Sequence, residues 1–193
     1  YPEGYCRLDP RALAQVPEEV ALRVLSRLLR AIAGRPHPPR LEKVENLLAL
    51  ILRGGLQGGA TSAGCHLLAR ADGLFICREL AAVEGHRPLG ENVIWDRRFR
   101  LRLGEVVSGQ EIGALGEEGF ALYRRGCPEF DRQGRPALVF QGLPALWQGE
   151  RLIDVPHLPP LPASPLSPAL QLHFLPADFF DISAFSSPLR HTI

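Results

Sequence analysis

The spacing of hydrophobic residues changes near residue 55, and this change restricts the chain to folds that contain both helices and strands. From about residue 17 to residue 53, apolar side chains recur at helical intervals. From about residue 61 to residue 77, they follow the shorter period of strands. We therefore predict an α+β fold: a helical hairpin plus a β-hairpin, followed by a small β-rich α+β domain.

Two main helices are expected in the first 55 residues, over residues 17–33 and 40–53. A short helical turn at residues 10–15 should precede them, because Asp9-Pro10 is a favourable helix start. The connector at residues 35–39 contains three prolines and cannot continue a helix. The two helices should therefore pack against each other as a hairpin.

The strands are expected to begin with one at residues 61–67, a turn at Ala71-Asp72-Gly73 and a return strand at residues 74–77. Residues 81–91 are interpreted as a linker. The further elements expected along the chain are a long strand at 93–103, a strand at 112–115, a helix at 117–125, strands at 143–147 and 152–155, and an edge strand at 170–175.

These elements suggest three regions: residues 1–85 with the helical pair and β-hairpin, residues 86–158 as a small β-rich domain, and residues 159–193 as a proline-rich extended tail. No apolar run approaches the roughly 18 residues of a membrane span, and the N-terminus lacks the pattern of a signal peptide. We therefore expect a soluble, cytoplasmic protein with no membrane partner.

The first residue and the composition of the chain indicate what kind of protein the chain comes from. The chain begins at Tyr1 and contains no Met, so we expect it to be a piece of a longer chain or an engineered one. All but one of its 22 basic residues are Arg, which is typical of a GC-rich genome. The formal net charge is only +1, so any site for an anionic partner has to be local.

No motif in the sequence indicates an active site. There is no Walker A sequence, and the glycine-rich run at residues 54–59 follows a helix instead of preceding one. The four cysteines lie far apart, which argues against a zinc site and favours reduced, partly buried thiols. We expect no catalytic residues, no metal ligands and no cofactor in this chain.

Two groups of arginines are candidates for RNA binding, because guanidinium groups bind phosphate well. The alternating strand predicted at residues 93–103 would place arginines on the face opposite its apolar side chains. The first group consists of Arg97, Arg98, Arg100 and Arg102. The second group, on the first main helix and around the corner of the helical hairpin, consists of Arg23, Arg27, Arg30, Arg35 and Arg40. Ordinary solvated surfaces paired with nearby acids are the alternative interpretation of both groups.

The order of these segments resembles the region behind the catalytic domain of bacterial tRNA(Ile)-lysidine synthases. The resemblance covers about residues 5–158 and depends on the order and spacing of all its parts. Those parts are Val20-Ala21-Leu22-Arg23-Val24-Leu25, Pro39-Arg40-Leu41-Glu42-Lys43-Val44-Glu45-Asn46-Leu47, Ala60-Thr61-Ser62-Ala63-Gly64-Cys65, Cys77-Arg78-Glu79, Val93-Ile94-Trp95-Asp96-Arg97-Arg98-Phe99, and Leu143-Pro144-Ala145-Leu146-Trp147 followed by Leu152 and Val155-Pro156.

The resemblance implies that the parent enzyme modifies an anticodon cytidine of isoleucine tRNA to lysidine, using ATP and lysine. The ATP motif of that family, Ser-Gly-Gly-x-Asp-Ser, does not occur in this sequence. The resemblance therefore implies a non-catalytic C-terminal region that holds tRNA, with ATP and Mg²⁺ required only by a catalytic N-terminal domain of the same polypeptide. Some members carry a Lys/Arg-rich helix before the closing hairpin, whereas the helix expected here at 117–125 ends in Arg124 and Arg125 alone.

Two other functions remain open from the sequence. The two helices at residues 17–33 and 40–53 could form a helix-turn-helix of a DNA-binding regulator, although the connector lacks a tight glycine turn. The chain could also be a structural or dimerisation module, in which Asp178-Phe179-Phe180 of the tail contacts a second copy.

Overall fold

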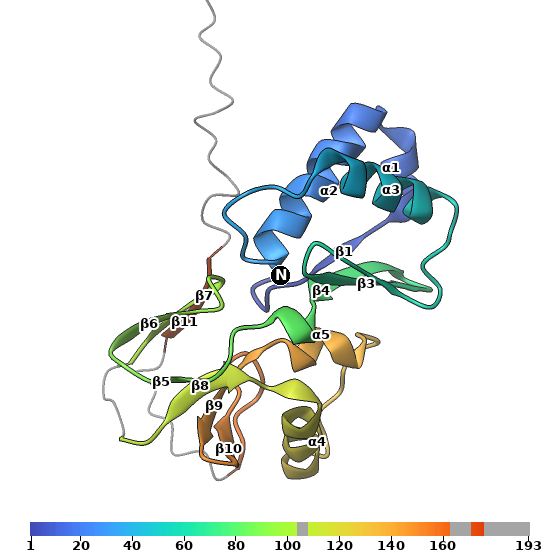
Figure 1. Cartoon of the computed structure of the whole chain (residues 1–193). Coiled ribbons are helices and arrows are strands. Elements are labelled where there is room, and N and C mark those ends of the chain that lie inside the picture. The colour runs from blue at the N-terminus through green and yellow to red at the C-terminus, as the bar shows by residue number, and fades with distance from the viewer. Residues whose placement is uncertain (104–107, 163–170, 176–193) are drawn as a thin grey trace, which may run out of the picture.

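The structure, a computed structural model, describes residues 1–103, 108–162 and 171–175. It has three antiparallel sheets and five α-helices within these residues (Figure 1). The α+β fold predicted from the sequence is confirmed, with the helical pair and its β-hairpin at the start of the chain and the β-rich part after them.

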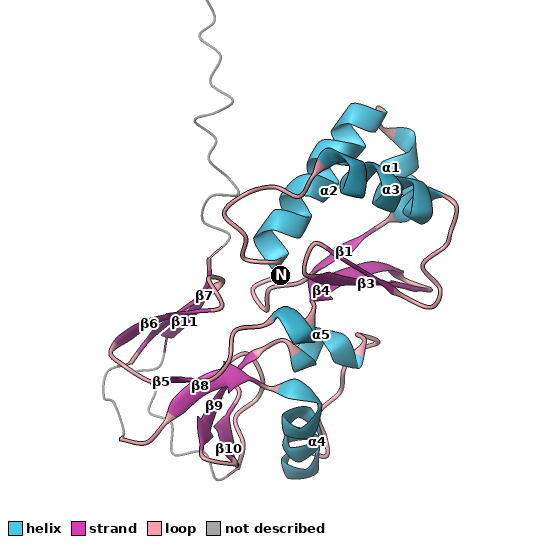
Figure 2. Ribbon diagram, in the orientation of Figure 1, coloured by secondary structure: helices cyan, strands magenta, loops and turns pink. Residues whose placement is uncertain are grey.

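The first part of the chain is a layer of helices on a four-stranded sheet (Figure 2). The helices are α1 (Pro10–Gln15), α2 (Glu18–Ile32) and α3 (Leu41–Leu52), close to their predicted bounds. The strands, in sheet order, are β1 (Cys6–Leu8), β4 (Gly73–Arg78), β3 (Cys65–Arg70) and β2 (Ala60–Ser62). Buried leucines of α2 and α3 pack on the inner faces of β3 and β4, so this layer forms one hydrophobic core.

Strand β4 is apolar on both faces because both faces are covered. Leu74 and Ile76 belong to the core beneath α2 and α3. Phe75 and Cys77 point the other way and pack with Phe140 and other buried residues of the second part of the chain. The sheet therefore lies between α2 and α3 on one side and α5 (Ala137–Gln141) on the other (Figure 2). The domain boundary at residues 85 and 86 stays a prediction.

The second part of the chain contains two smaller sheets and α4 (Gly116–Gly126). The first of them has the order β10 (Arg151–Asp154), β9 (Pro144–Gln148), β8 (Glu111–Ala114) and β5 (Arg87–Pro88). The other has the order β11 (Gln171–Phe174), β7 (Phe99–Arg102) and β6 (Asn92–Trp95). Buried side chains from both sheets share a third hydrophobic core.

Two segments that were each predicted to be a single strand are instead pairs of strands joined by a turn, and these two predictions are wrong. The segment at residues 61–67 is two paired strands, β2 and β3, joined at Ala63 and Gly64 with φ of 55° and 82°. The strand predicted at residues 93–103 is the hairpin of β6 and β7. Apolar residues occupy odd-numbered positions on both sides of the turn, and the turn has no glycine, so the pattern suggested one long strand.

Strand β1 and helix α5 were not expected, and β5 lies within the segment interpreted as a linker. The predicted edge strand is confirmed as β11, which pairs with β7 at the edge of its sheet. Most of the proline-rich tail, including Asp178-Phe179-Phe180, lies outside the described residues.

Candidate nucleic-acid interface

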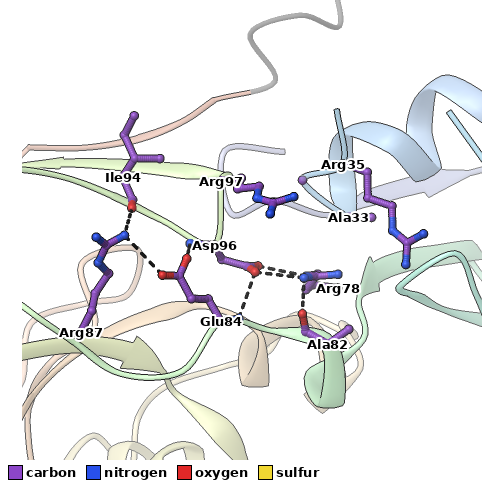
Figure 3. A pocket seen from close by; sticks show the side chains of 10 residues that line it. Ala33, Arg35, Arg78, Ala82, Glu84, Arg87, Ile94, Asp96 and Arg97 are labelled. Atoms are coloured by element: carbon purple, nitrogen blue, oxygen red, sulfur yellow. Dashed lines mark hydrogen bonds and ion pairs between the residues drawn. The ribbon is translucent and has the colours of Figure 1, made fainter. Parts of the chain in front are cut away.

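A pocket of about 640 Å³, lined by several charged residues, lies where the C-terminal end of α2 meets the end of β4 and the β6–β7 turn (Figure 3). It brings together one arginine from each predicted group, Arg35 and Arg97, which are 62 positions apart in the sequence. Its lining residues are Ala33, Gly34, Arg35, Arg78, Ala82, Glu84, Arg87, Ile94, Asp96 and Arg97.

The helix C-terminus that carries Arg35 is determined by local sequence. Gly34 has a φ of +61°, a conformation that glycine adopts without strain. Its N–H donates to the Ala31 carbonyl at 3.2 Å, and the Arg35 N–H donates to the Arg30 carbonyl at 3.0 Å. This pair of hydrogen bonds is the Schellman motif, which ends the helix and turns Arg35 away from its axis.

The turn that carries Arg97 is unusual in its residues. Asp96 and Arg97 have φ of 50° and 56°, and the Arg98 N–H donates to the Trp95 carbonyl at 3.1 Å. Two consecutive left-handed residues are normal for a tight β-hairpin, but glycine or asparagine usually occupies the second position. An arginine in this position adds backbone strain, which natural proteins tend to retain at functional sites.

The carboxylate of Asp96 joins three segments beneath the pocket. It accepts two hydrogen bonds from Arg78, each 3.0 Å long, and one of 2.6 Å from Nε of Arg98. It also accepts the backbone N–H of Glu84 at 3.0 Å. The side chain of Asp96 is 4% exposed and that of Arg98 1%. This buried ion-pair network therefore ties β4 to the β6–β7 turn.

The protonation of this network follows from its charges. Burial by itself would raise the pKa of Asp96, but the hydrogen bonds and charges of Arg78 and Arg98 outweigh burial and lower it. Burial also lowers the pKa of Arg98 to about 10, against the opposing effect of Asp96. Asp96 and Arg98 are therefore both charged at neutral pH.

The lowered pKa of Asp96 predicts a loss of stability in acid. Its carboxylate binds protons more weakly in the folded state than in the unfolded state, where the pKa is about 3.9. The stabilisation is therefore present above pH 4 and disappears as the pH falls through the lower folded-state pKa. Urea unfolding between pH 7 and pH 2 should show this loss, and the Asp96→Asn variant should lack that part of the pH dependence. Equal pH dependence in the two proteins would contradict the prediction.

Arg98 does not lie on an open strand face, and this part of the sequence prediction is wrong. Its guanidinium group is buried, donates to the Gly142 carbonyl at 3.1 Å and lies over the ring of Phe99. The residue follows the turn directly, so its side chain points into the molecule to meet Asp96. Arg98 is therefore not accessible for an RNA contact.

Arg100 and Arg102 lie on the face of β7 opposite the buried Phe99 and Leu101, as the alternation predicted. Arg100 is half-buried and pairs across the sheet with Ile94 and His173. Arg102 is exposed. Ile94 also lines the pocket, and it lies on the same sheet face as its cross-strand partner Arg100.

The second arginine group is divided by the fold. Arg23, Arg27 and Arg30 line a groove between α2 and α3 of about 720 Å³. Three carboxylates, those of Glu18, Glu19 and Glu45, line the same groove, and Glu19 pairs with Arg23 at 2.5 Å. Arg40 is exposed just before α3 and lines neither the groove nor the pocket. Arg35 alone of this group reaches the pocket.

Sequence reasoning missed the residues that build the pocket floor. Arg78 and Glu84 come from segments interpreted as a strand end and a linker, and Asp96 was placed within a long strand. Glu84 accepts the backbone N–H of Asp96 at 2.8 Å and pairs with Arg87 at 3.3 Å. An aspartate between two apolar runs is a usual turn residue, which is the one signal that could have revealed this hairpin.

Other kinds of site find little support in the described part of the chain. Those residues contain no group of three or more His, Cys, Asp or Glu side chains that could hold a metal ion. The four cysteines are free, and burial raises the pKa of Cys6, Cys65 and Cys77 to about 12. Among the described residues, no helix is both long and apolar enough to span a membrane.

Comparisons with known proteins point to one enzyme. The chain is 32% identical to a tRNA(Ile)-lysidine synthase of Ruegeria pomeroyi over 153 residues, which cover 79% of this chain and 34% of that protein. It is 37% identical over 106 residues to that of Anaplasma marginale, covering 53% and 23%. It is 30% identical over 164 residues to that of Wolbachia pipientis wMel, covering 79% and 35%.

No protein-family model and no solved structure matches the chain. The matches to the curated proteins extend over most of the chain, whereas the chain spans only about a third of the length of the first of these relatives. The resemblance noted in the sequence is confirmed by these matches. The chain is therefore homologous to part of the tRNA(Ile)-lysidine synthases.

Proposed function

We propose that this chain is the tRNA-binding, non-catalytic C-terminal region of a tRNA(Ile)-lysidine synthase. The observation that carries the proposal is the 32% identity over 153 residues to one such enzyme. The sequence lacks the Ser-Gly-Gly-x-Asp-Ser motif, so we assign ATP and Mg²⁺ binding to a catalytic N-terminal domain of the same polypeptide in the cytoplasm. The remaining task for this chain is to bind and orient isoleucine tRNA.

The surface of the molecule is compatible with such a role. Arg35, Arg97 and Arg102 are exposed, and they arise from two different parts of the fold. A protein that recognises a folded RNA reads mainly its shape and its backbone, for which dispersed guanidinium groups are well suited. Because the net charge is near zero, binding would depend on these local groups.

The proposal predicts selective, salt-dependent binding of tRNA. The chain should be titrated with isoleucine tRNA, an unrelated tRNA and duplex DNA at several salt concentrations. We expect tRNA to bind more tightly than DNA, with an affinity that falls as salt rises because phosphate contacts release counterions. Equal affinity for DNA would favour a DNA-binding regulator. Absence of binding to all three, together with a stable homodimer, would favour a dimerisation module.

A second test concerns the parent gene. If the proposal is correct, the codons upstream of Tyr1 should encode Ser-Gly-Gly-x-Asp-Ser at a strand-to-helix turn, where a helix N-terminus can face phosphate. Sequencing that upstream region checks the expectation directly. An upstream region without this motif would contradict the assignment.

A further inference from the structure

The pocket between α2 and the β6–β7 turn has an excess of positive charge. Four guanidinium groups and two carboxylates line it. The carboxylate of Asp96 is paired with Arg78 inside the pocket and with the buried Arg98 behind it, and Glu84 is paired with Arg87. The two carboxylates are thus already engaged by arginines other than Arg35 and Arg97.

Arg35 and Arg97 make no side-chain hydrogen bond or ion pair with any other residue in the described ranges. Both are exposed, and Figure 3 shows them entering the upper part of the pocket from different segments, without dashed lines to their neighbours. Two like charges on one pocket repel each other unless an anion lies between them.

Close packing holds these two arginines near each other. A Cβ atom on Gly34 would lie 2.6 Å from the Asp96 carbonyl and 3.5 Å from Cβ of Arg97, so the helix end and the turn are in direct contact. A Cβ atom on Gly64 would lie 3.5 Å from Nη2 of Arg35. This contact fixes the backbone positions from which the two side chains project.

We propose that Arg35 and Arg97 together bind one backbone phosphate of an RNA strand in this pocket, an inference that rests on the tRNA-binding function proposed above. Guanidinium groups offer paired N–H donors that match phosphate oxygens. The positive φ of Arg97 is a second observation, since a strained arginine where glycine is preferred indicates a functional constraint.

A polymer explains the surroundings of the pocket better than a free anion does. Ile94 belongs both to the pocket and to the face of the third sheet that carries Arg100 and Arg102. Arginines two residues apart on a strand lie about 7 Å apart. Further phosphates of the same RNA strand can therefore lie along β7 while one phosphate occupies the pocket.

The test compares two double variants that remove the same charge. Arg35→Ala with Arg97→Gly removes the proposed phosphate ligands, and glycine suits the left-handed position, so this variant should fold at least as well at the turn. Arg53→Ala with Arg132→Ala is the control, because both residues are exposed and neither lines the pocket. Affinity for isoleucine tRNA is measured over a range of salt concentrations. A second readout follows the backbone amide resonances of residues 35 and 97 during titration with inorganic phosphate.

We expect the pocket variant to lose about tenfold in affinity for each arginine removed, and its salt dependence to fall by about one unit of slope. If the wild type binds tRNA and both variants weaken binding equally, the pocket is not a phosphate site. If the wild type binds no tRNA but phosphate shifts the two resonances, the proposed function fails, and so does the assignment to an RNA strand. If neither ligand has an effect, both proposals fail.

Discussion

Replacing Asp96 with Asn is expected to lower the free energy of unfolding by about 3–5 kcal/mol, the usual effect of breaking a buried ion pair. The variant has nearly the same shape, but it leaves the guanidinium groups of Arg78 and Arg98 without a counter-charge. Both guanidinium groups are nearly inaccessible to water, with side-chain exposures of 9% and 1%. Urea unfolding at pH 7, followed by circular dichroism, measures the change.

Asp72→Asn provides the matched control for that experiment. Asp72 pairs with Arg7 at 3.1 Å, but each side chain is 45% exposed, so water replaces much of the interaction. The loss should be less than about 1 kcal/mol. If the two variants lost similar stability, the network around Asp96 would not stabilise the fold in the way its burial indicates.

Replacing Gly34 with Ala is expected to cost about 2–4 kcal/mol, from a left-handed alanine and from overpacking. The added Cβ would lie 2.6 Å from the Asp96 carbonyl and 2.8 Å from Cγ of Arg98. The end of α2 would have to move away from the β6–β7 turn, which would also widen the pocket. The change in unfolding free energy measures the cost, and tRNA affinity should fall in the same variant.

Gly54→Ala separates the backbone cost from the contact cost. Gly54 ends α3 in the same Schellman motif, with a φ of +72° and the same pair of hydrogen bonds. A Cβ atom there would meet nothing within 4 Å. Its substitution should therefore cost only the left-handed conformation, about 1–2 kcal/mol. An equal loss in the two glycine variants would show that the contact between α2 and the turn contributes nothing.

The candidate site depends on both parts of the fold. Arg35 is carried by the helical part and Arg97 by a small sheet, and buried pairs of Asp96 hold β4 to the turn between them. A change in either part should therefore alter the pocket. The ion-pair network of Asp96 lies directly beneath Arg35 and Arg97 and holds together the two parts of the fold that carry them.

The helices were predictable because their signals are local. Spacing of apolar residues, the prolines of the connector and Gly34 and Gly54 determine α1, α2 and α3 to within two residues. The β6–β7 hairpin was not predictable in this way. Its turn residues, Asp96 and Arg97, adopt left-handed conformations that only surrounding contacts make favourable.

The α+β class, the two helix C-termini and the resemblance to the lysidine synthases were all predictable from the amino-acid sequence. Each of these depends on residues close together in the chain or on the order of segments. Which arginines are exposed for an RNA contact depends on how the chain packs in three dimensions. Arg98 is buried beside Asp96 and does not reach the surface. Arg23 shares its groove with three carboxylates. The packing of Gly34 against the turn brings Arg35 close to Arg97. Charge alone cannot distinguish these residues, because their availability depends on neighbours that are distant in sequence.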